Sequence, residues 1–270
     1  MTQDLIRYFV VDAFTERPFG GNPAAVVLLP EWLDDTWLQN IAMEMNLSET
    51  AFLVRKQSRF ELRWFTPAVE VDLCGHATLA SAFALLHAGL QEAQSKMEFS
   101  TRSGILTATS HGGRIQLDFP LKPESPTNPP VDLLEGLAVT PAYVGKSEDD
   151  YLVEVKTEHE LRSLTPQFDR LAKLDCRGII VTSTSTEPEF DFLSRFFGPA
   201  VGVNEDPVTG SAHCCLAHYW QKRTGRNRFT AFQASPRGGV VHLTVKQNRV
   251  LLAGNAIIVA EGELMVCRES

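Results

Sequence analysis

The sequence lacks the short motifs by which proteins commonly hold a nucleotide or a structural metal ion. It contains no G-x-x-x-x-G-K-[ST] run, and the turn at residues 19–22 lacks the G-x-G-x-x-G spacing of a dinucleotide-binding loop. Its five cysteines are an odd set without a C-x-x-C pair. Such a set is neither a disulfide framework nor a zinc pattern, and it favours a reducing compartment.

Basic clusters and membrane-length apolar runs are also missing. No Lys/Arg-rich run occurs and the formal net charge is -8, so we expect no nucleic-acid partner. Residues 1–7 do not have the charged-then-apolar layout of a signal peptide. The apolar run within residues 72–89 is too short for a bilayer, which needs roughly 20 apolar residues. We therefore expect a cytoplasmic protein without a membrane partner.

What is present is the composition of a globular protein with room for two domains. The chain has 270 residues, of which 44% are hydrophobic and 21% charged. Five prolines fall within residues 120–130, which excludes a helix or a central strand there. We expect an N-terminal domain at 1–119, completed by the last strand near 256–270, and a C-terminal domain at 120–255.

Hydrophobic periodicity predicts alternating strands and helices. The first half should hold strands at 6–13, 24–29, 50–54, 60–65, 99–109 and 114–119, with helices from Asp34 or Asp35 to about 46 and from 75 to 88. The second half should hold helices at 132–137 and 165–174, strands at 151–155 and 178–182, and a closing meander at 241–245, 249–252 and 256–259.

The helix after residue 74 is unusual, because it carries almost nothing polar on any face and should be buried. Its first turn, Cys74, Gly75 and His76, lies where backbone N–H groups have no partner within the helix and the helix dipole is positive. A thiol, an imidazole and free amides there fit an anion-binding site. Close packing at Gly75 and capping by His76 would explain the same residues equally well.

The sequence around this stretch is repeated later in the chain. Residues 65–71 recur as residues 197–203, with five of the seven positions identical. Cys74-Gly75-His76-Ala77 is then answered by Thr209-Gly210-Ser211-Ala212, and each copy enters a helix of small and apolar residues. Duplication could bring two helix N-termini to face each other across one cleft, where a small carboxylate-bearing substrate would meet free amides from both sides.

Five ordered motifs, at residues 11–15, 21–27, 48–52, 74–78 and 205–213, together resemble the PhzF family of phenazine-biosynthesis isomerase-like proteins. The resemblance implies an α/β (α+β) fold like that of diaminopimelate epimerase. It has two similar domains, each a curled, mostly antiparallel sheet around a central buried helix, with the site in the cleft between them. Members of the family need no metal or organic cofactor, and dimers are common.

The resemblance also implies roles for individual residues. The founding reaction of the family is the isomerisation of dihydro-3-hydroxyanthranilate, a proton shift on a cyclic diene acid. Carried over position by position, Glu49 is the proton-transferring acid/base, and His76 and Asp206 complete the catalytic set. Substrate-binding positions are Cys74, Gly75, Thr209, Gly210 and Ser211.

These residue types suit that chemistry. Moving a proton between carbons needs a base beside an acidified C–H and an acid that returns the proton, and one carboxylate, Glu49, can do both. His76 could donate a hydrogen bond or a proton. Asp206 could orient His76 or hold a substrate amine or hydroxyl, and Ser211 could donate to a carboxylate. Each residue also has an ordinary structural explanation, as a loop carboxylate, a cap or a turn residue.

Two other functions remain open from the sequence. A two-base racemase or epimerase of this fold would need a thiol on each side of the substrate, and Thr209 stands where the partner of Cys74 should be. A non-catalytic protein that binds a small acid is the other alternative. A metal site is not expected, because His213 and His218 are not spaced i, i+4 on one helix face. The substrate itself cannot be identified from the sequence.

Overall fold

The computed structural model describes the backbone of residues 3–267 and the side chains of residues 5–265, and it divides into two compact units. Within the described residues, unit 1 holds the chain up to Asp118 and again from Ala253, and unit 2 holds Phe119–Leu252. The chain passes into unit 2 within a strand. The proline-rich segment at 120–130 lies in unit 2, where Ser125–Pro126 pairs with another strand of that unit.

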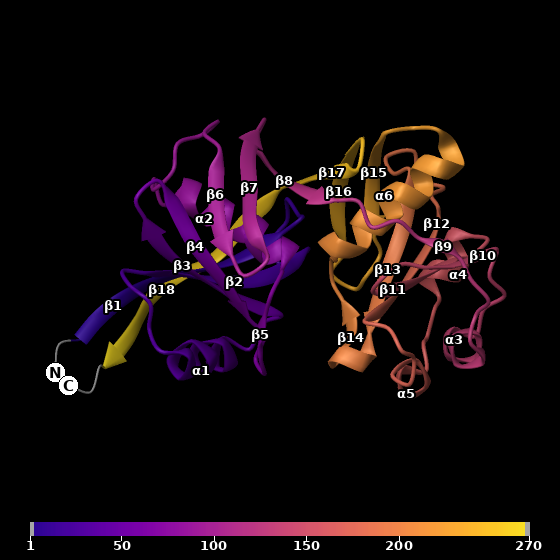
Figure 1. Ribbon diagram of the computed structural model, residues 1–270, viewed down its shortest axis with the longest axis horizontal. Helices are drawn as coiled ribbons and strands as arrows, with labels where there is room; N and C mark the ends of the chain where they lie inside the picture. Colours follow the sequence, from indigo (N-terminus) through magenta and orange to yellow (C-terminus); the bar gives the residue numbers. More distant parts are fainter. Residues whose placement is uncertain (1–2, 268–270) are drawn as a thin grey trace. The chain divides into compact units, whose positions relative to one another are not determined.

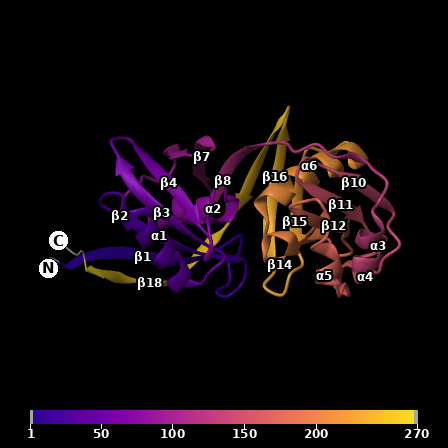
Figure 2. The ribbon, with the colours of Figure 1, turned by 60° about the horizontal axis from the view of Figure 1, so that its bottom comes forward.

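The described part of unit 1 contains two helices among its strands (Figure 1). Its elements are β1 (Gln3–Ala13), β2 (Asn22–Leu29), α1 (Asp35–Met45), β3 (Glu49–Lys56), β4 (Arg59–Phe65), β5 (Glu70–Val71), α2 (Gly75–His87), β6 (Met97–Thr101), β7 (Gly104–His111), β8 (Arg114–Pro120) and β18 (Ala256–Cys267). Both views (Figures 1 and 2) show β1 beside β18, and the two strands pair antiparallel along their whole length.

The two helices of unit 1 cover opposite faces of its sheet. Phe52 and Val54 of β3 belong to the apolar cluster that contains Leu38 and Ala42 of α1. Side chains alternate between faces along a strand, so the buried Leu53 points the other way. On that face α2 contacts β1, β2 and β3. The sequence prediction of a buried helix is confirmed, since nine of the thirteen residues of α2 are buried.

Unit 2 is built from the remaining elements. They are β9 (Ser125–Pro126), α3 (Val131–Leu137), β10 (Tyr143–Lys146), β11 (Asp150–Glu154), α4 (Glu158–Arg162), α5 (Phe168–Leu171), β12 (Gly178–Thr184), β13 (Phe192–Gly198), the 3-10 helix η1 (Pro199–Val201), β14 (Val203–Asp206), α6 (Gly210–Thr224), β15 (Arg228–Gln233), β16 (Gly239–Lys246) and β17 (Arg249–Gly254), whose last two residues belong to unit 1.

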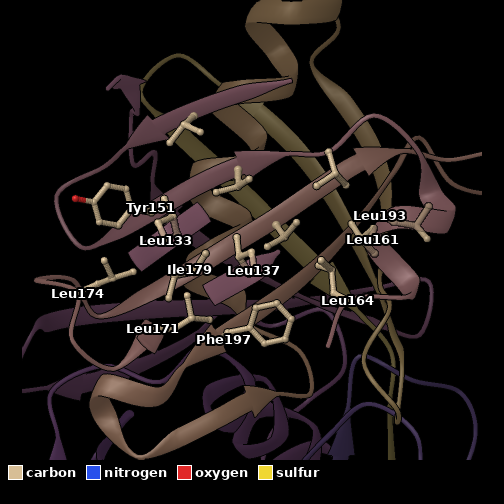
Figure 3. Close-up of a cluster of buried hydrophobic side chains, with 14 residues drawn as sticks. Leu133, Leu137, Tyr151, Leu161, Leu164, Leu171, Leu174, Ile179, Leu193 and Phe197 are labelled. Carbon is tan, nitrogen blue, oxygen red and sulfur yellow. The ribbon is translucent and has the colours of Figure 1, made fainter. Parts of the chain in front are cut away.

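The core of unit 2 also has two faces. Leu193 and Phe197 of β13 lie in a cluster with side chains from α3, α4 and α5, which Figure 3 shows. Their neighbour Phe192 points to the opposite face and stacks on Trp220 of α6, with ring centroids 5.3 Å apart. Helix α6 is thus the buried counterpart of α2, on the face of the strands away from α3, α4 and α5.

The two units share one order of strand pairing. In unit 1, β2 pairs parallel with β3, β3 antiparallel with β4, and β4 parallel with β6. In unit 2, β11 pairs parallel with β12, β12 antiparallel with β13, and β13 parallel with β15. Helices α2 and α6 occupy the same place in this order. The sequence repeat at 65–71 and 197–203 is therefore part of a repeat of the whole supersecondary unit.

Three sequence predictions of local structure need correction. The single strand expected at 99–109 is two strands, β6 and β7, that form a hairpin around the turn at 102–103. The helix expected at 165–174 is only the single turn of α5, because a run of backbone turns replaces it from Ala172 onward. Glu49, expected in a loop, is the first residue of β3.

None of the helices described is both long and apolar enough to cross a membrane.

Candidate active site

The first candidate residues lie at the N-terminus of α2, which the chain reaches from β4 through a turn and the short strand β5. Cys74 is the N-cap residue, with extended backbone angles of φ -142 and ψ 113, and its side chain makes no capping hydrogen bond. The first N–H groups of the helix, at Gly75 and His76, therefore have no side-chain cap. The local geometry is that of an anion-binding helix end.

Glu49 and His76 meet at this helix end. The Nε2 atom of His76 lies 3.1 Å from Oε2 of Glu49, and the His76 side chain is only 6% exposed against 20% for Glu49. Although they lie within ion-pair distance, neither atom has a hydrogen bond of acceptable geometry to any described residue. Buried polar atoms are rarely left this way, so the pair has hydrogen-bonding capacity for a ligand.

The opposite side of the His76 ring is held by two other side chains. Its Nδ1 atom lies 3.5 Å from Sγ of Cys74 and 3.2 Å from the amide nitrogen of Asn22. When the imidazole is neutral, Nδ1 accepts from that amide, which places the ring proton on Nε2, facing Glu49. Asn22 is thus a positioning residue that the sequence analysis did not single out.

A glycine places Asn22 beside His76. Gly21 has φ +60, and a Cβ atom on it would lie 2.0 Å from the carbonyl oxygen of Ala13. Any other residue would clash with backbone at this point. The motif Gly21-Asn22-Pro23 could have indicated Asn22, because a glycine required by the backbone directly precedes a buried polar side chain.

The charges of this cluster are interdependent. Burial lowers the pKa of His76, but the negative charges of a Cys74 thiolate and of Glu49 outweigh burial and hold it well above 6.5. Burial, with Glu49 adding to it, raises the pKa of the Cys74 thiol above 9.0. The sulfur is therefore protonated near neutral pH, and the negative charge that then remains beside His76, and raises its pKa, is that of Glu49.

We expect an NMR titration of the imidazole resonances to show this coupling. His76 should titrate above its ordinary value of about 6.5, and Glu49→Gln should lower its pKa. The imidazolium–carboxylate pair then contributes stability that is fully present below about pH 6.5 and is lost as pH rises through the folded-state pKa.

His213 of α6 is the matched control for this titration. It is also fully buried, and burial lowers its pKa to about 4, with the backbone of Thr209 opposing the shift. Glu49→Gln should leave it unchanged. A pKa for His76 below 6.5 in the unmodified protein would contradict the assigned ion pair.

Among the residues that the structure describes, one group of side chains could offer ligands to a metal ion. Glu49, Cys74 and His76 have candidate ligand atoms within 4.8 Å of one another. However, Cys74 approaches Nδ1 of the imidazole and Glu49 approaches Nε2. One ion uses one ring nitrogen, so the three side chains cannot keep these contacts and chelate together. The expected absence of a metal stays a prediction.

The second candidate set lies at the N-terminus of α6. Its N-cap residue Thr209 is extended, with φ -111 and ψ 101, and its side chain does not cap the helix. Instead, the Thr209 hydroxyl donates a short hydrogen bond to Oδ2 of Asp206. Gln233, fully buried on β15, accepts from the Thr209 N–H at 2.9 Å and donates to the Asp206 carbonyl at 2.7 Å.

Ser211 lies in the first turn of α6, and its hydroxyl group contacts an arginine outside that helix. Nη1 of Arg177 donates to its hydroxyl oxygen at 2.8 Å. Neither Gln233 nor Arg177 is indicated as a site residue by the sequence. Neither belongs to the duplicated motif, and only the pairing of β13 with β15 brings Gln233 to this turn.

The predicted site residues thus form two groups. Glu49, Cys74, Gly75 and His76 come together in unit 1, and Asp206, Thr209, Gly210 and Ser211 come together in unit 2. Each group lies at the N-terminus of a buried helix whose N-cap side chain makes no capping hydrogen bond. Both helices occupy the same place in the order of strand pairing. Only the first contains a carboxylate beside an imidazole.

Known proteins resemble this chain over nearly its whole length. The sequence pattern of the PhzC-PhzF family, described as phenazine biosynthesis-like protein, matches residues 11–262. An uncharacterized isomerase of Halalkalibacterium halodurans is 54% identical over 259 residues, which cover 96% of this chain and 98% of that one.

Solved structures agree with these sequence relatives. The crystal structure of a PhzF family protein from Enterococcus faecalis has a TM-score of 0.93 and 41% identity, covering 97% of this chain and 100% of that one. A hydroxyproline epimerase from Agrobacterium vitis has a TM-score of 0.63 at 10% identity, covering 97% of this chain and 93% of that one, and shows the fold alone. The predicted mixed α/β fold is therefore confirmed. With its duplicated pairing order and its two helix-end groups, the chain belongs to the PhzC-PhzF family of phenazine biosynthesis-like proteins and is an isomerase.

Proposed function

We propose that this isomerase moves a proton on a small unsaturated or amino-bearing carboxylic acid, without a cofactor, and that Glu49 is the acid/base. The observation that carries the proposal is the Glu49–His76 pair. Its facing Oε2 and Nε2 atoms, 3.1 Å apart, have no well-formed hydrogen bond to a described residue, and they lie beside the uncapped N-terminus of α2. Such a pair can bond a substrate without first breaking a protein hydrogen bond.

The proposed reaction has two proton transfers. The carboxylate of Glu49 takes a proton from a substrate C–H that is acidified by conjugation, and the electron pair moves into the conjugated system. Glu49 is then neutral, and the imidazolium of His76 is left without its counter-charge. It can donate a hydrogen bond to the negative charge that develops on the substrate. Glu49 returns the proton to a different carbon, which completes the isomerisation.

The carboxylate of the substrate is assigned to the helix ends. Free amides at Gly75 and Gly210 and the hydroxyl of Ser211 are suitable donors for an anion. Assigning both groups to one substrate rests on the family resemblance and on the duplicated pairing order. Dimer formation and a cytoplasmic location rest on the resemblance and composition in the same way.

Two-base racemisation is the second candidate, and the named epimerase with the same fold is what favours it. In such a mechanism Cys74 would need to act as a thiolate opposite a second base. Burial and Glu49 raise the pKa of Cys74, and Thr209 at the corresponding N-cap is hydrogen-bonded to Asp206. Both observations favour Glu49 as the base. Inactivation by a thiol reagent at Cys74, with solvent deuterium entering both enantiomers of an amino acid, would support racemisation instead.

The test is a screen for solvent hydrogen exchange. We expect the protein, incubated in D2O with a panel of cyclic diene, enoic and amino acids, to move deuterium into a C–H position of one structural class, as seen by proton NMR. Prior dialysis against a chelator should leave the rate unchanged. Tight binding of an acid without any exchange would contradict the proposal and indicate a binding protein.

A further inference from the structure

Arg177, the residue directly before β12, is fixed in place by a buried carboxylate. Its Nε donates to Oδ1 of Asp150 at 2.9 Å, and its Nη2 makes a short bond to Oδ2 of the same residue. The Asp150 side chain is 0% exposed, whereas that of Arg177 is 34% exposed. The two-pronged pair orients the guanidinium and leaves its outer edge accessible.

The buried partner depends on this contact. Burial raises the pKa of Asp150, and the hydrogen bonds and charge of Arg177 oppose that shift. The chain itself adds to the anchoring, since the backbone N–H of Arg177 donates to the carbonyl of Asp149 at 2.7 Å. The carboxylate of Asp150 balances the charge of the guanidinium group. Arg177 therefore contributes, at its exposed edge, mainly hydrogen-bond donors with a fixed orientation.

The fixed orientation of these donors determines which hydrogen bonds the Ser211 hydroxyl can make. A hydroxyl group has one hydrogen to donate and lone pairs to accept. The Arg177 Nη1–H occupies a lone pair of the Ser211 oxygen, at 2.8 Å. An arginine cannot accept a hydrogen bond, so the hydroxyl hydrogen of Ser211 must point elsewhere. Ser211 is thereby presented as a donor at the first turn of α6.

The surroundings of that turn suit an anionic acceptor. Thr209 leaves the helix end uncapped, and the Gln233 side chain holds the preceding turn in shape. Burial raises the pKa of Cys214, in the second turn, to about 12, even though the positive charges of Lys122, Arg177 and Arg249 lower it. Three basic side chains therefore lie near the first two turns of α6, of which Arg177 is paired with Asp150 and Lys122 with Asp149.

We propose that Arg177 is a positioning residue that fixes the Ser211 hydroxyl as a hydrogen-bond donor, and that this makes the α6 end select a carboxylate over a neutral amide. The inference rests on the proposed function, in which Ser211 binds the carboxylate of the substrate. It assigns specificity to a side chain outside the duplicated motif. It also gives the buried Asp150 a role, which is to orient the partly exposed Arg177.

The experiment is a double-mutant cycle read by calorimetry. The probes are 2-aminobenzoate and its uncharged analogue 2-aminobenzamide. Arg177→Gln combined with Asp150→Asn keeps a hydrogen-bonded neutral pair, so no charge is left buried alone. We expect this double variant to bind 2-aminobenzoate about tenfold more weakly, and 2-aminobenzamide within about twofold. In a Ser211→Ala background the same changes should add less than about twofold, because Arg177 acts through Ser211.

A neighbouring ion pair gives the matched control. Lys122 and Asp149 pair beside the same helix, as a short contact that does not involve Ser211. Lys122→Gln with Asp149→Asn should leave 2-aminobenzoate binding unchanged. An equal loss there would show that the general positive field, not positioning, determines binding. Arg177→Lys keeps the positive charge but loses the bidentate geometry of the guanidinium group, and it should also weaken the binding of 2-aminobenzoate.

Several results would overturn the inference. They are additive effects in the cycle, equal losses for the acid and the amide, and no measurable binding of 2-aminobenzoate to the unmodified protein. Calorimetry needs no turnover, so a failed deuterium screen with a coupled cycle would reject only the proposed function. Conversely, deuterium exchange on an identified acid with a KM unaffected by the double variant would reject only the role of Arg177. Near-ultraviolet circular dichroism checks that each variant is folded.

Discussion

Replacing Glu49 by Gln should lower the rate of deuterium incorporation by about 10²- to 10⁴-fold, the usual contribution of a general acid–base group. The amide has nearly the shape of the carboxylate but cannot take a proton, and the change removes a negative charge that raises the pKa of His76. Both transfers of the proposed reaction are therefore lost together. The measurement is the initial rate of exchange on the acid identified in the screen, with kcat and KM separated.

Glu44 provides the control for this substitution. It lies on α1, its side chain is exposed, and the same change to glutamine should leave the rate unchanged. The loss at Glu49 should appear in kcat, because the group acts in the chemical step. If the Glu49 variant retains the rate within about twofold, the base is another residue and the proposed mechanism is wrong.

The second large effect concerns stability. Phe197→Ala should reduce the free energy of unfolding by about 3–5 kcal/mol, because it removes a large side chain from a packed core. Phe197 is 0% exposed, packs against the tilted ring of Phe168 with ring centroids 6.1 Å apart, and lies under the guanidinium of Arg195. This loss is a large part of the about 5–15 kcal/mol that holds a typical domain together. Urea unfolding followed by circular dichroism measures it.

Two further variants calibrate that result. Phe197→Leu keeps most of the apolar volume and should cost less than half as much. Phe19→Ala makes the same truncation at a side chain that is 77% exposed, and it should change stability by no more than about 0.5 kcal/mol. Equal losses for Phe197→Ala and Phe19→Ala would mean that the cluster around Phe197 is not the core of unit 2.

The fold could be predicted to the extent that its signals are local. The all-apolar run after Cys74 predicted a buried helix, and the repeat at 197–203 predicted its counterpart α6. Asp34 predicted the start of α1, where its side chain accepts from the N–H groups of Thr36 and Trp37. The short helix α5 was over-predicted, because apolar spacing at residues 165–174 is equally compatible with turns that bury Leu171 and Leu174.

The candidate site divides in the same way. Glu49, His76 and Ser211 belong to short ordered motifs, and so the sequence could indicate them. Asn22 also lies in such a motif, at residues 21–27, but only the tertiary fold shows that it contacts His76. Arg177, directly before β12, reaches Ser211 from outside the motifs. An arginine just before a strand has no sequence feature that separates it from a surface cation. Its importance depends on Asp150, which lies 27 residues earlier in the chain.

The pairing of β1 with β18 has a consequence for the order of folding during synthesis. Strand β18 follows the whole of unit 2 in the chain, yet it pairs antiparallel with β1 from Gln3–Cys267 to Ala13–Ala256, with one register shift between Val10 and Val11. On the ribosome, unit 2 has all its strands while β1 still exposes one edge to the solvent. Unpaired edges of this kind invite association with other chains. The first half of the protein must therefore wait for the last strand, which makes it the half that most needs protection while nascent.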